Sequence, residues 1–272
     1  MNAIDFPRLN RIARDQRDTY AVAAPFPHAV IDDFLPAEAA EQLLLDFDQA
    51  QEGWKHYTHY NERKLALTNL AQMPPHTQKV MAALQSQQAI DFVSALAQIE
   101  GLVSDPDLEG AGMHLVKKGG FLNVHTDFLT HTKKPTWARR INLLLYLNKD
   151  WQDDWHGNLD LWNADMSACI QSVKPVFNRC VIFSTTENSF HGHPYKLDCP
   201  PDRSRKCLLL YYYRDEGREL GFSATDYRPT PDASYMERAL IAADRTLLQA
   251  YTFIKRRSRL GDDTISRILK RF

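Results

Sequence analysis

The 272-residue sequence lacks the marks of several protein classes. No apolar run approaches the roughly 18 residues that a membrane-spanning helix needs. A net charge of −1 gives the molecule no strong electrostatic attraction to nucleic acid or acidic lipid. Residues 1–20 do not show the basic-then-apolar order of a secretory signal. We therefore expect a globular protein with no transmembrane segment and no nucleic-acid partner.

Cysteine is sparse and unpaired in the sequence. The four cysteines, Cys169, Cys180, Cys199 and Cys207, form no Cys-x-x-Cys pair. A structural zinc site needs closely paired thiolate ligands, so this class of site is excluded. Unpaired thiols are typical of a reducing compartment, and we expect a cytoplasmic protein.

Several catalytic motifs are also missing. The sequence has no Gly-x-Ser-x-Gly elbow, no His-Glu-x-x-His, no P-loop and no complete Gly-x-Gly-x-x-Gly. Residues 110–112 (Gly-Ala-Gly) are too short a match to indicate a dinucleotide site. These absences narrow the field to chemistries that do not depend on such motifs.

The organisation of the chain changes along its length. Hydrophobic residues make up 44% and charged residues 25%, as in an ordinary globular protein, and we see no internal repeat. The first third is predicted to be mostly helical after a short strand at 29–34. Pro36 takes the first position of one helix, a second helix covers 77–85, and a third begins after Ser86 and ends near Gly101.

From about residue 110 the pattern turns to short strands separated by turn signals, typical of a sandwich or barrel. The candidate strands are 113–117, 121–127, 141–148, 158–162, 169–173, 180–184, 190–194 and 206–213. From residue 234 the pattern is helical again, and 265–272 places apolar residues at helical spacing with basic residues between them. This last segment has three open interpretations: packing on the domain, an oligomer contact, or a membrane surface.

The triplet His125-Thr126-Asp127 follows a turn and an expected strand. Side chains alternate along a strand, so His125 and Asp127 point to the same face. A second His-containing segment, 189–192, follows about 60 residues later. A distant His on a neighbouring strand would complete the two-His, one-carboxylate triad of non-heme Fe(II) oxygenases. His191 and His193 share a strand face, so alternation alone leaves both open as the third ligand.

Four further stretches accompany the triad. They are 146–151 (Tyr-Leu-Asn-Lys-Asp-Trp), 156–162 (His-Gly-Asn-Leu-Asp-Leu-Trp), 175–183 (Pro-x-x-Asn-Arg-x-Val-Ile-Phe) and 205–207 (Arg-Lys-Cys). With them, the region from about Gly110 to Tyr213 resembles the Fe(II)- and 2-oxoglutarate-dependent dioxygenases, specifically the prolyl 4-hydroxylase-like branch. His156 stands where that family has the first Gly of a Gly-Gly-x-Leu strand.

The resemblance implies that His125, Asp127 and His191 bind Fe(II). The family's distal ligand directly precedes a small residue, here Gly192, which favours His191 over His193. The resemblance also implies that Arg205 binds the far carboxylate of 2-oxoglutarate, a task that suits the planar, permanently charged guanidinium. Arg203 and Lys206 are its competitors.

Other residues take expected roles around the cosubstrate. Tyr146 would donate its hydroxyl to the same carboxylate, Leu159 would form an apolar wall, and Asn142 shares the strand face of Tyr146. Cys207 stands where many such enzymes have Ser, and a thiol is the weaker hydrogen-bond donor. His114 and His131 are candidates for the mouth of the pocket, and a generic polar role is the equal alternative for both.

The implied fold is mainly β with flanking α: a double-stranded β-helix, or jelly roll. We expect its core at 110–215, a helical support region at 1–109 packed on it, and a helical extension at 216–272.

The implied reaction uses O2 and 2-oxoglutarate, releases succinate and CO2, and hydroxylates a C–H bond, with ascorbate as a stimulant. Related halogenases lack the carboxylate ligand, so Asp127 argues for hydroxylation.

Two substrate hypotheses remain open. The first is a peptidyl residue, prolyl before others, because the motifs are those of that branch. The alternative is a small molecule such as a free amino acid or a biosynthetic intermediate, and the segments that decide are 57–67 and 128–137. A third hypothesis, from a different class, is a non-catalytic jelly-roll module that binds or senses. Fold and motif do not fix the substrate.

Overall fold

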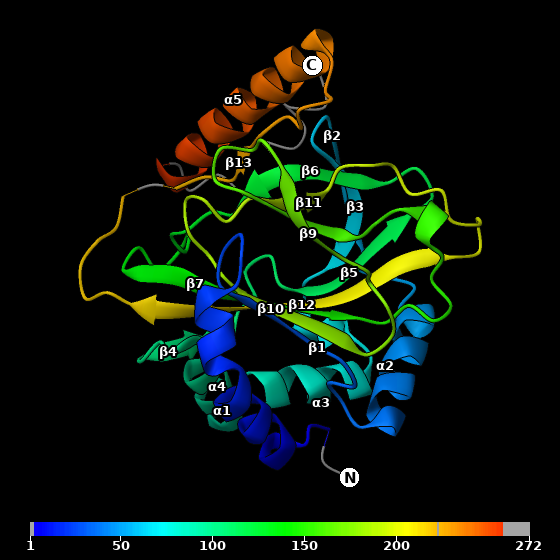
Figure 1. Cartoon of the computed structure of the whole chain (residues 1–272), viewed down its shortest axis with the longest axis vertical. Helices are drawn as coiled ribbons and strands as arrows, with labels where there is room; N and C mark the ends of the chain where they lie inside the picture. The colour runs from blue at the N-terminus through cyan, green and yellow to red at the C-terminus, as the bar shows by residue number, and fades with distance from the viewer. Residues whose placement is uncertain (1–2, 222, 258–272) are drawn as a thin grey trace.

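The computed structural model describes residues 3–221 and 223–257. Its centre is an antiparallel sheet of thirteen strands that curls over on itself (Figure 1). The main strand order is β1-β10-β7-β12-β5-β3-β6-β11-β8-β9, while β2, β4 and β13 pair with β3, β12 and β6. The strands are β1 (His28–Ile31), β2 (Lys55–His59), β3 (Glu62–Leu67), β4 (Leu102–Ser104), β5 (Gly112–Lys117), β6 (Phe121–Thr126), β7 (Trp137–Tyr146), β8 (Leu159–Trp162), β9 (Cys169–Val173), β10 (Arg179–Ser184), β11 (His191–His193), β12 (Ser204–Asp215) and β13 (Asp226–Tyr227).

The two halves of this sheet face each other. Strands β7, β10 and β12 supply one wall, and β8 and β9 supply the other. Buried side chains from both walls form one apolar cluster that includes Leu144 and Val181 from the first wall and Leu159 and Leu161 from the second. This is the predicted jelly-roll core. Every strand predicted between 113 and 213 is present; β9 has the predicted bounds, and the other strands have shifted ends.

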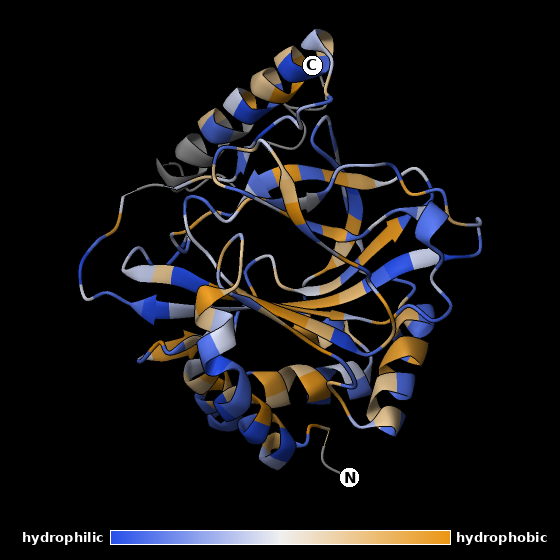
Figure 2. Ribbon diagram, viewed as in Figure 1, coloured by the Kyte–Doolittle hydropathy of each residue, from blue (hydrophilic) through white to orange (hydrophobic). Residues whose placement is uncertain are grey.

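Helices cover the outer face of the β7–β10–β12 wall (Figures 1 and 2). They are α1 (Phe6–Val22), α2 (Ala37–Gln49), α3 (Pro75–Leu84) and α4 (Gln87–Ala97). Leu43, Met81 and Phe92 are fully or almost fully buried, in the same cluster as Leu143 and Leu145 of β7. Each such side chain contributes about 1.5–3 kcal/mol of burial free energy, so the helices brace the wall that carries the site.

The helix α5 (Tyr235–Arg257) lies at the opposite end of the molecule from α1–α4 (Figure 1). No helix among the described residues is long and apolar enough to cross a membrane. The terminal segment 265–272, for which three interpretations were open, lies outside the described residues.

The end predicted for the third helix was wrong. The Ser86 side chain caps α4 as expected, accepting a hydrogen bond from the Ala89 amide at 3.4 Å. The helix ends at Gln98, which adopts a left-handed φ of 56° and bonds its amide to the Ser94 carbonyl. Gln98 therefore takes the place expected of Gly101.

The first third of the chain is less helical than predicted. Besides β1, it contributes the hairpin of β2 and β3 and the short β4. β3 pairs with both β5 and β6, so it joins the two walls of the core. The hairpin gave no clear alternation in the sequence because β2 is largely exposed and pairs with only one strand, β3, among the described residues.

Candidate metal centre

Three side chains converge at one point inside the curled sheet. His125 lies in β6, Asp127 just beyond its end, and His191 at the start of β11, directly across from His125. The His125 Nε2 lies 3.7 Å from Asp127 Oδ1, and the His191 Nε2 lies 3.4 Å from Asp127 Oδ2. One ligand atom from each residue lies within 4.8 Å of the others. Strand pairing therefore brings together the triad expected from the sequence.

The hydrogen bonds of both imidazoles suit a metal. The Nδ1 of His125 lies 2.9 Å from the Asn123 carbonyl, and the Nδ1 of His191 lies 2.8 Å from the Ser189 carbonyl. A carbonyl only accepts, so each Nδ1 carries the hydrogen and each Nε2 keeps its lone pair. Burial lowers the pKa of His191 to about 4, which keeps this ring neutral. Two imidazoles and one carboxylate form a donor set that fits Fe(II).

A bulge determines which histidine joins the triad. The pairing of β11 with β6 shifts between His191 and His193, so that His193 lies opposite Leu122. A Cβ on Gly192 would lie 2.9 Å from the Leu122 carbonyl oxygen and 2.9 Å from the Val124 Cα. Only glycine permits this close approach. His191 is the histidine that the structure groups with His125 and Asp127.

Arg139, which no pattern in the sequence indicated, holds Asp127. The Arg139 Nη2 lies 3.0 Å from Asp127 Oδ2, and the Asn142 side-chain amide donates to the same oxygen at 2.7 Å. The Arg139 guanidinium also lies 3.3 Å from the Tyr211 ring centroid and 4.8 Å from that of Phe128. Burial opposes ionisation of Asp127, but the Arg139 charge outweighs it and holds the pKa of this carboxyl well below its usual value.

A second bulge explains the miss. Asn142, Leu144 and Tyr146 follow strict alternation, which would send an odd-numbered position such as Arg139 to the opposite face. Between β7 and β12 the register shifts, with Tyr212 opposite Ile141 but Tyr213 opposite Arg139. The extra residue in β7 turns Arg139 inward, and alternation in the sequence carries no sign of it.

Arg205 and Cys207 of β12 line the same cavity, and Tyr146 is hydrogen-bonded to Arg205; we call this side the cosubstrate end of the cavity. Arg205 is 5% exposed; its Nε donates to the Gly157 carbonyl at 2.7 Å and its Nη2 to the Tyr146 hydroxyl at 3.1 Å. The Tyr146 oxygen accepts this bond, so its own hydrogen stays free to donate. None of the ion pairs formed by the described residues involves Arg205.

The competitors of Arg205 point elsewhere. Lys206 faces the other side of β12, with its Nζ 3.4 Å from Asp48 Oδ1, as alternation predicted. Arg203 is exposed in the turn before β12. Cys207 lines the cavity, and burial raises its pKa to about 12, so it stays a thiol.

The two histidines that were candidates for the mouth of the pocket lie in different places. His114 lines the cavity. His131 does not: it is fully buried between Asp105 and Glu109, with its Nε2 3.2 Å from Asp105 Oδ2. It anchors the segment that joins β6 to β7.

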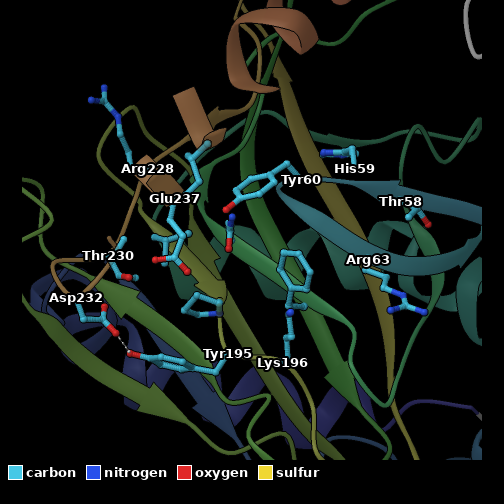
Figure 3. A pocket seen from close by; sticks show the side chains of 16 residues that line it. Thr58, His59, Tyr60, Arg63, Tyr195, Lys196, Arg228, Thr230, Asp232 and Glu237 are labelled. Atoms are coloured by element: carbon cyan, nitrogen blue, oxygen red, sulfur yellow. Dashed lines mark hydrogen bonds between the residues drawn. The ribbon is translucent and has the colours of Figure 1, made fainter. Parts of the chain in front are cut away.

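The cavity that holds the triad has a volume of about 80 Å³. It is lined by all three triad residues and by Arg139, Asn142, Leu144, Leu159, His193, Arg205 and Cys207 among others. A larger cavity of about 590 Å³ lies against the outer side of β6, between the β2–β3 hairpin and the start of α5 (Figure 3). Tyr60, Lys196 and Glu237 reach into it, but no triad residue lines it. This larger cavity is therefore separate from the candidate metal centre.

Residues 111–214 match the family model described as 2OG-Fe(II) oxygenase superfamily. Prolyl 3-hydroxylase OGFOD1 of Mus musculus is 28% identical over 177 residues, which are 61% of this chain and 29% of that protein. The chain thus spans under a third of the length of this relative.

Two solved structures share the fold. A Pseudomonas putida prolyl-4-hydroxylase aligns with a TM-score of 0.52 and 19% identity, covering 76% of this chain and 98% of that one. HygX from Streptomyces hygroscopicus, solved with nickel, 2-oxoglutarate and hygromycin B, aligns with a TM-score of 0.52 and 15% identity, covering 79% of this chain and 97% of that one. The family match covers the triad and Arg205, so this part of the chain is similar to the 2OG-Fe(II) oxygenase superfamily, and the chain has a prolyl-hydroxylase-like fold.

Proposed function

We propose that this protein is an Fe(II)- and 2-oxoglutarate-dependent hydroxylase that acts on a peptidyl residue, prolyl before others. The observation that carries the proposal is the buried charge of Arg205. This guanidinium shares a cavity with the triad and forms no ion pair with a described residue. A buried charge without a partner is costly, and an anionic ligand removes that cost.

2-Oxoglutarate fits both ends of the cavity. Its keto and adjacent carboxylate oxygens suit a metal held by His125, Asp127 and His191, and its far carboxylate suits Arg205 and the free hydroxyl hydrogen of Tyr146. Leu144 and Leu159 supply the apolar wall between the two ends.

The residues of this chain prepare the site for the reaction. When bound, Fe(II) activates O2, and the consumption of 2-oxoglutarate yields succinate, CO2 and a hydroxylated substrate. The Asn123 and Ser189 carbonyls hold both imidazoles with Nε2 directed at the shared point. Arg139 and Asn142 occupy Asp127 Oδ2, which keeps the carboxylate ionised and fixes its orientation. Buried apolar side chains limit the access of water.

Similarity to prolyl hydroxylases supports a peptidyl substrate. The neighbours with the same fold include a Pseudomonas putida prolyl-4-hydroxylase. The name of the OGFOD1 relative, a prolyl 3-hydroxylase, supports proline as the first residue to test.

The test measures succinate released from 2-oxoglutarate in the presence of Fe(II) and ascorbate, with and without candidate peptides. The wild type is compared with Asp127→Ala and with Asp18→Ala, an exposed aspartate in α1. We expect Asp18→Ala to match the wild type and Asp127→Ala to fall to about a hundredth or less. Equal release by the wild type and Asp127→Ala would contradict the proposal.

The substrate class is tested by mass spectrometry of a cell extract after incubation. We expect a peptide one oxygen atom heavier than its precursor. A free metabolite that gains oxygen, with no change in any peptide, would favour the small-molecule alternative. No succinate under any condition would favour the non-catalytic module.

We also propose that the protein acts in a reducing compartment, the cytoplasm. The support is that all four cysteines are free thiols, three of them buried.

A further inference from the structure

His193 is a buried polar residue that the metal centre does not use. It is 4% exposed, and its Nδ1 has no hydrogen-bond partner among the described residues. A buried donor or acceptor left without a partner costs about 1–3 kcal/mol. Such a group in a folded protein calls for an explanation, and a ligand is one of the few available.

The position of His193 points to the cosubstrate end of the cavity. The bulge at Gly192 pairs His193 with Leu122 and separates it from the triad, while its side chain still lines the cavity. Arg205 and Cys207 line the same cavity from β12. The imidazole and the guanidinium therefore face one small space from different strands.

The imidazole of His193 can supply a hydrogen-bond donor. An imidazole carries at least one N–H, and in this cavity a carboxylate oxygen would be its natural acceptor.

The neighbouring Cys207 is a weak hydrogen-bond donor, so a bound carboxylate would have acceptor sites free for another donor. Its nearest hydrogen-bond acceptor is the Leu208 carbonyl, at 3.6 Å from Sγ, and a thiol donates weakly. A carboxylate bound by Arg205 and Tyr146 offers more acceptor sites than these two residues fill, since two oxygens provide about four lone-pair positions.

We propose that His193 donates a hydrogen bond to the far carboxylate of 2-oxoglutarate, as a third donor beside Arg205 and Tyr146. The proposal rests on the proposed function, because it requires that the cavity binds this cosubstrate. It makes His193 a determinant of selectivity for 2-oxo acids that carry a second carboxylate.

The test compares two ligands that differ only at the far end. 2-Oxoglutarate and 2-oxopentanoate share the metal-chelating group, but the second ends in a methyl group. Full-length, Fe(II)-loaded protein is titrated with each under argon, and the charge-transfer absorption of the bound 2-oxo acid gives the Kd without turnover. The variants are His193→Val, which removes the donor, and His193→Gln, which keeps one.

We expect His193→Val to weaken 2-oxoglutarate about tenfold and 2-oxopentanoate less than about twofold, and His193→Gln to restore most of the loss. If His193→Val fails to fold, His193→Asn, whose amide is too short to reach, is expected to show the same loss. Equal weakening of both ligands, or no weakening, overturns the inference.

The wild type separates the two proposals. A wild type that prefers 2-oxoglutarate, together with a His193→Val variant that keeps the full preference, overturns the role of His193 alone. A wild type that binds both ligands equally overturns this role and the proposed cosubstrate together.

Discussion

The two ends of the candidate active cavity differ in whether a buried charge is paired with an opposite charge. At the metal end, Asp127 is paired with Arg139 and Asn142 within 3.0 Å, so its negative charge is balanced by the protein itself. At the cosubstrate end, Arg205 is buried and bonds only neutral groups, the Gly157 carbonyl and the Tyr146 hydroxyl.

The difference shows what each arginine contributes. Arg139 completes a buried ion pair, and such a pair destabilises the fold when one partner is removed. Arg205 carries a charge that no carboxylate among the described residues pairs with, so under the proposed function it contributes to ligand binding more than to stability. Both arginines line the same small cavity.

The largest expected effect is that of Arg139→Met. The change leaves the buried Asp127 carboxylate without its cation, so we expect the free energy of unfolding to fall by about 3–5 kcal/mol. Urea denaturation of metal-free protein measures this loss. Arg140→Met is the control, because the neighbouring Arg140 is paired with Glu216 near the surface. An Arg139→Met protein as stable as the wild type would remove the distinction between the two ends.

Arg205→Met is expected to act on affinity instead. We expect the Kd for 2-oxoglutarate to rise about 100-fold, because the cation that pairs with the far carboxylate is gone. The free energy of unfolding should stay within about 1 kcal/mol of the wild type, since no carboxylate partner is left exposed. The exposed Arg203→Met is the matched control and should change neither quantity. A loss of stability as large as that of Arg139→Met would refute the comparison.

Much of the metal end could be predicted from the sequence because its geometry is local. Alternation along one strand puts His125 and Asp127 on one face, and strand pairing then needs only one more histidine opposite. The choice of His191 over His193 depends on a bulge, and Gly192 was its single visible sign. The strands of the jelly roll could also be predicted from the sequence, because their buried faces are apolar and turn-forming residues separate them.

The rest depends on contacts that no local pattern records. Arg139 enters the cavity through a register shift that the partner strand β12 imposes. β2 is mostly exposed and gains its structure by pairing with β3. His131 was expected near the mouth but fills a buried site between two carboxylates supplied by Asp105 and Glu109. Each miss involves a residue whose environment is built by distant segments.

His59, which lies outside the cavity, carries a charge that pH can remove reversibly, so it tests the effect of ion pairing on stability. The His59 Nδ1 lies 2.8 Å from Asp244 on α5, and its Nε2 lies 2.9 Å from Glu62 on β3. Burial lowers the pKa of His59, but hydrogen bonds to both carboxylates outweigh it and raise the pKa to about 9. The imidazolium therefore ties α5 to the hairpin.

Because this pKa is raised in the folded state, the stabilisation is complete below pH 6.5 and is lost as the pH rises through about 9. We expect a loss of about 2 kcal/mol across that window in the wild type. Urea denaturation at both ends of the window measures it, and His59→Gln should not show this loss. The same pH dependence in both proteins would mean that another group is responsible.

The smallest expected effect is that of Cys207→Ser, which adds a donor at the unbalanced end. A hydroxyl donates more strongly than a thiol, so we expect the Kd for 2-oxoglutarate to fall about threefold. Cys180→Ser is the control, because Cys180 is buried in the apolar cluster behind the cavity. The gain should be larger in the His193→Val background, where the carboxylate has lost a donor and has a free acceptor site for the new hydroxyl. A higher Kd for 2-oxoglutarate in Cys207→Ser would instead show that the side chain at position 207 contacts the cosubstrate as an apolar group. Arg205, Tyr146 and His193 would then be the complete set of donors.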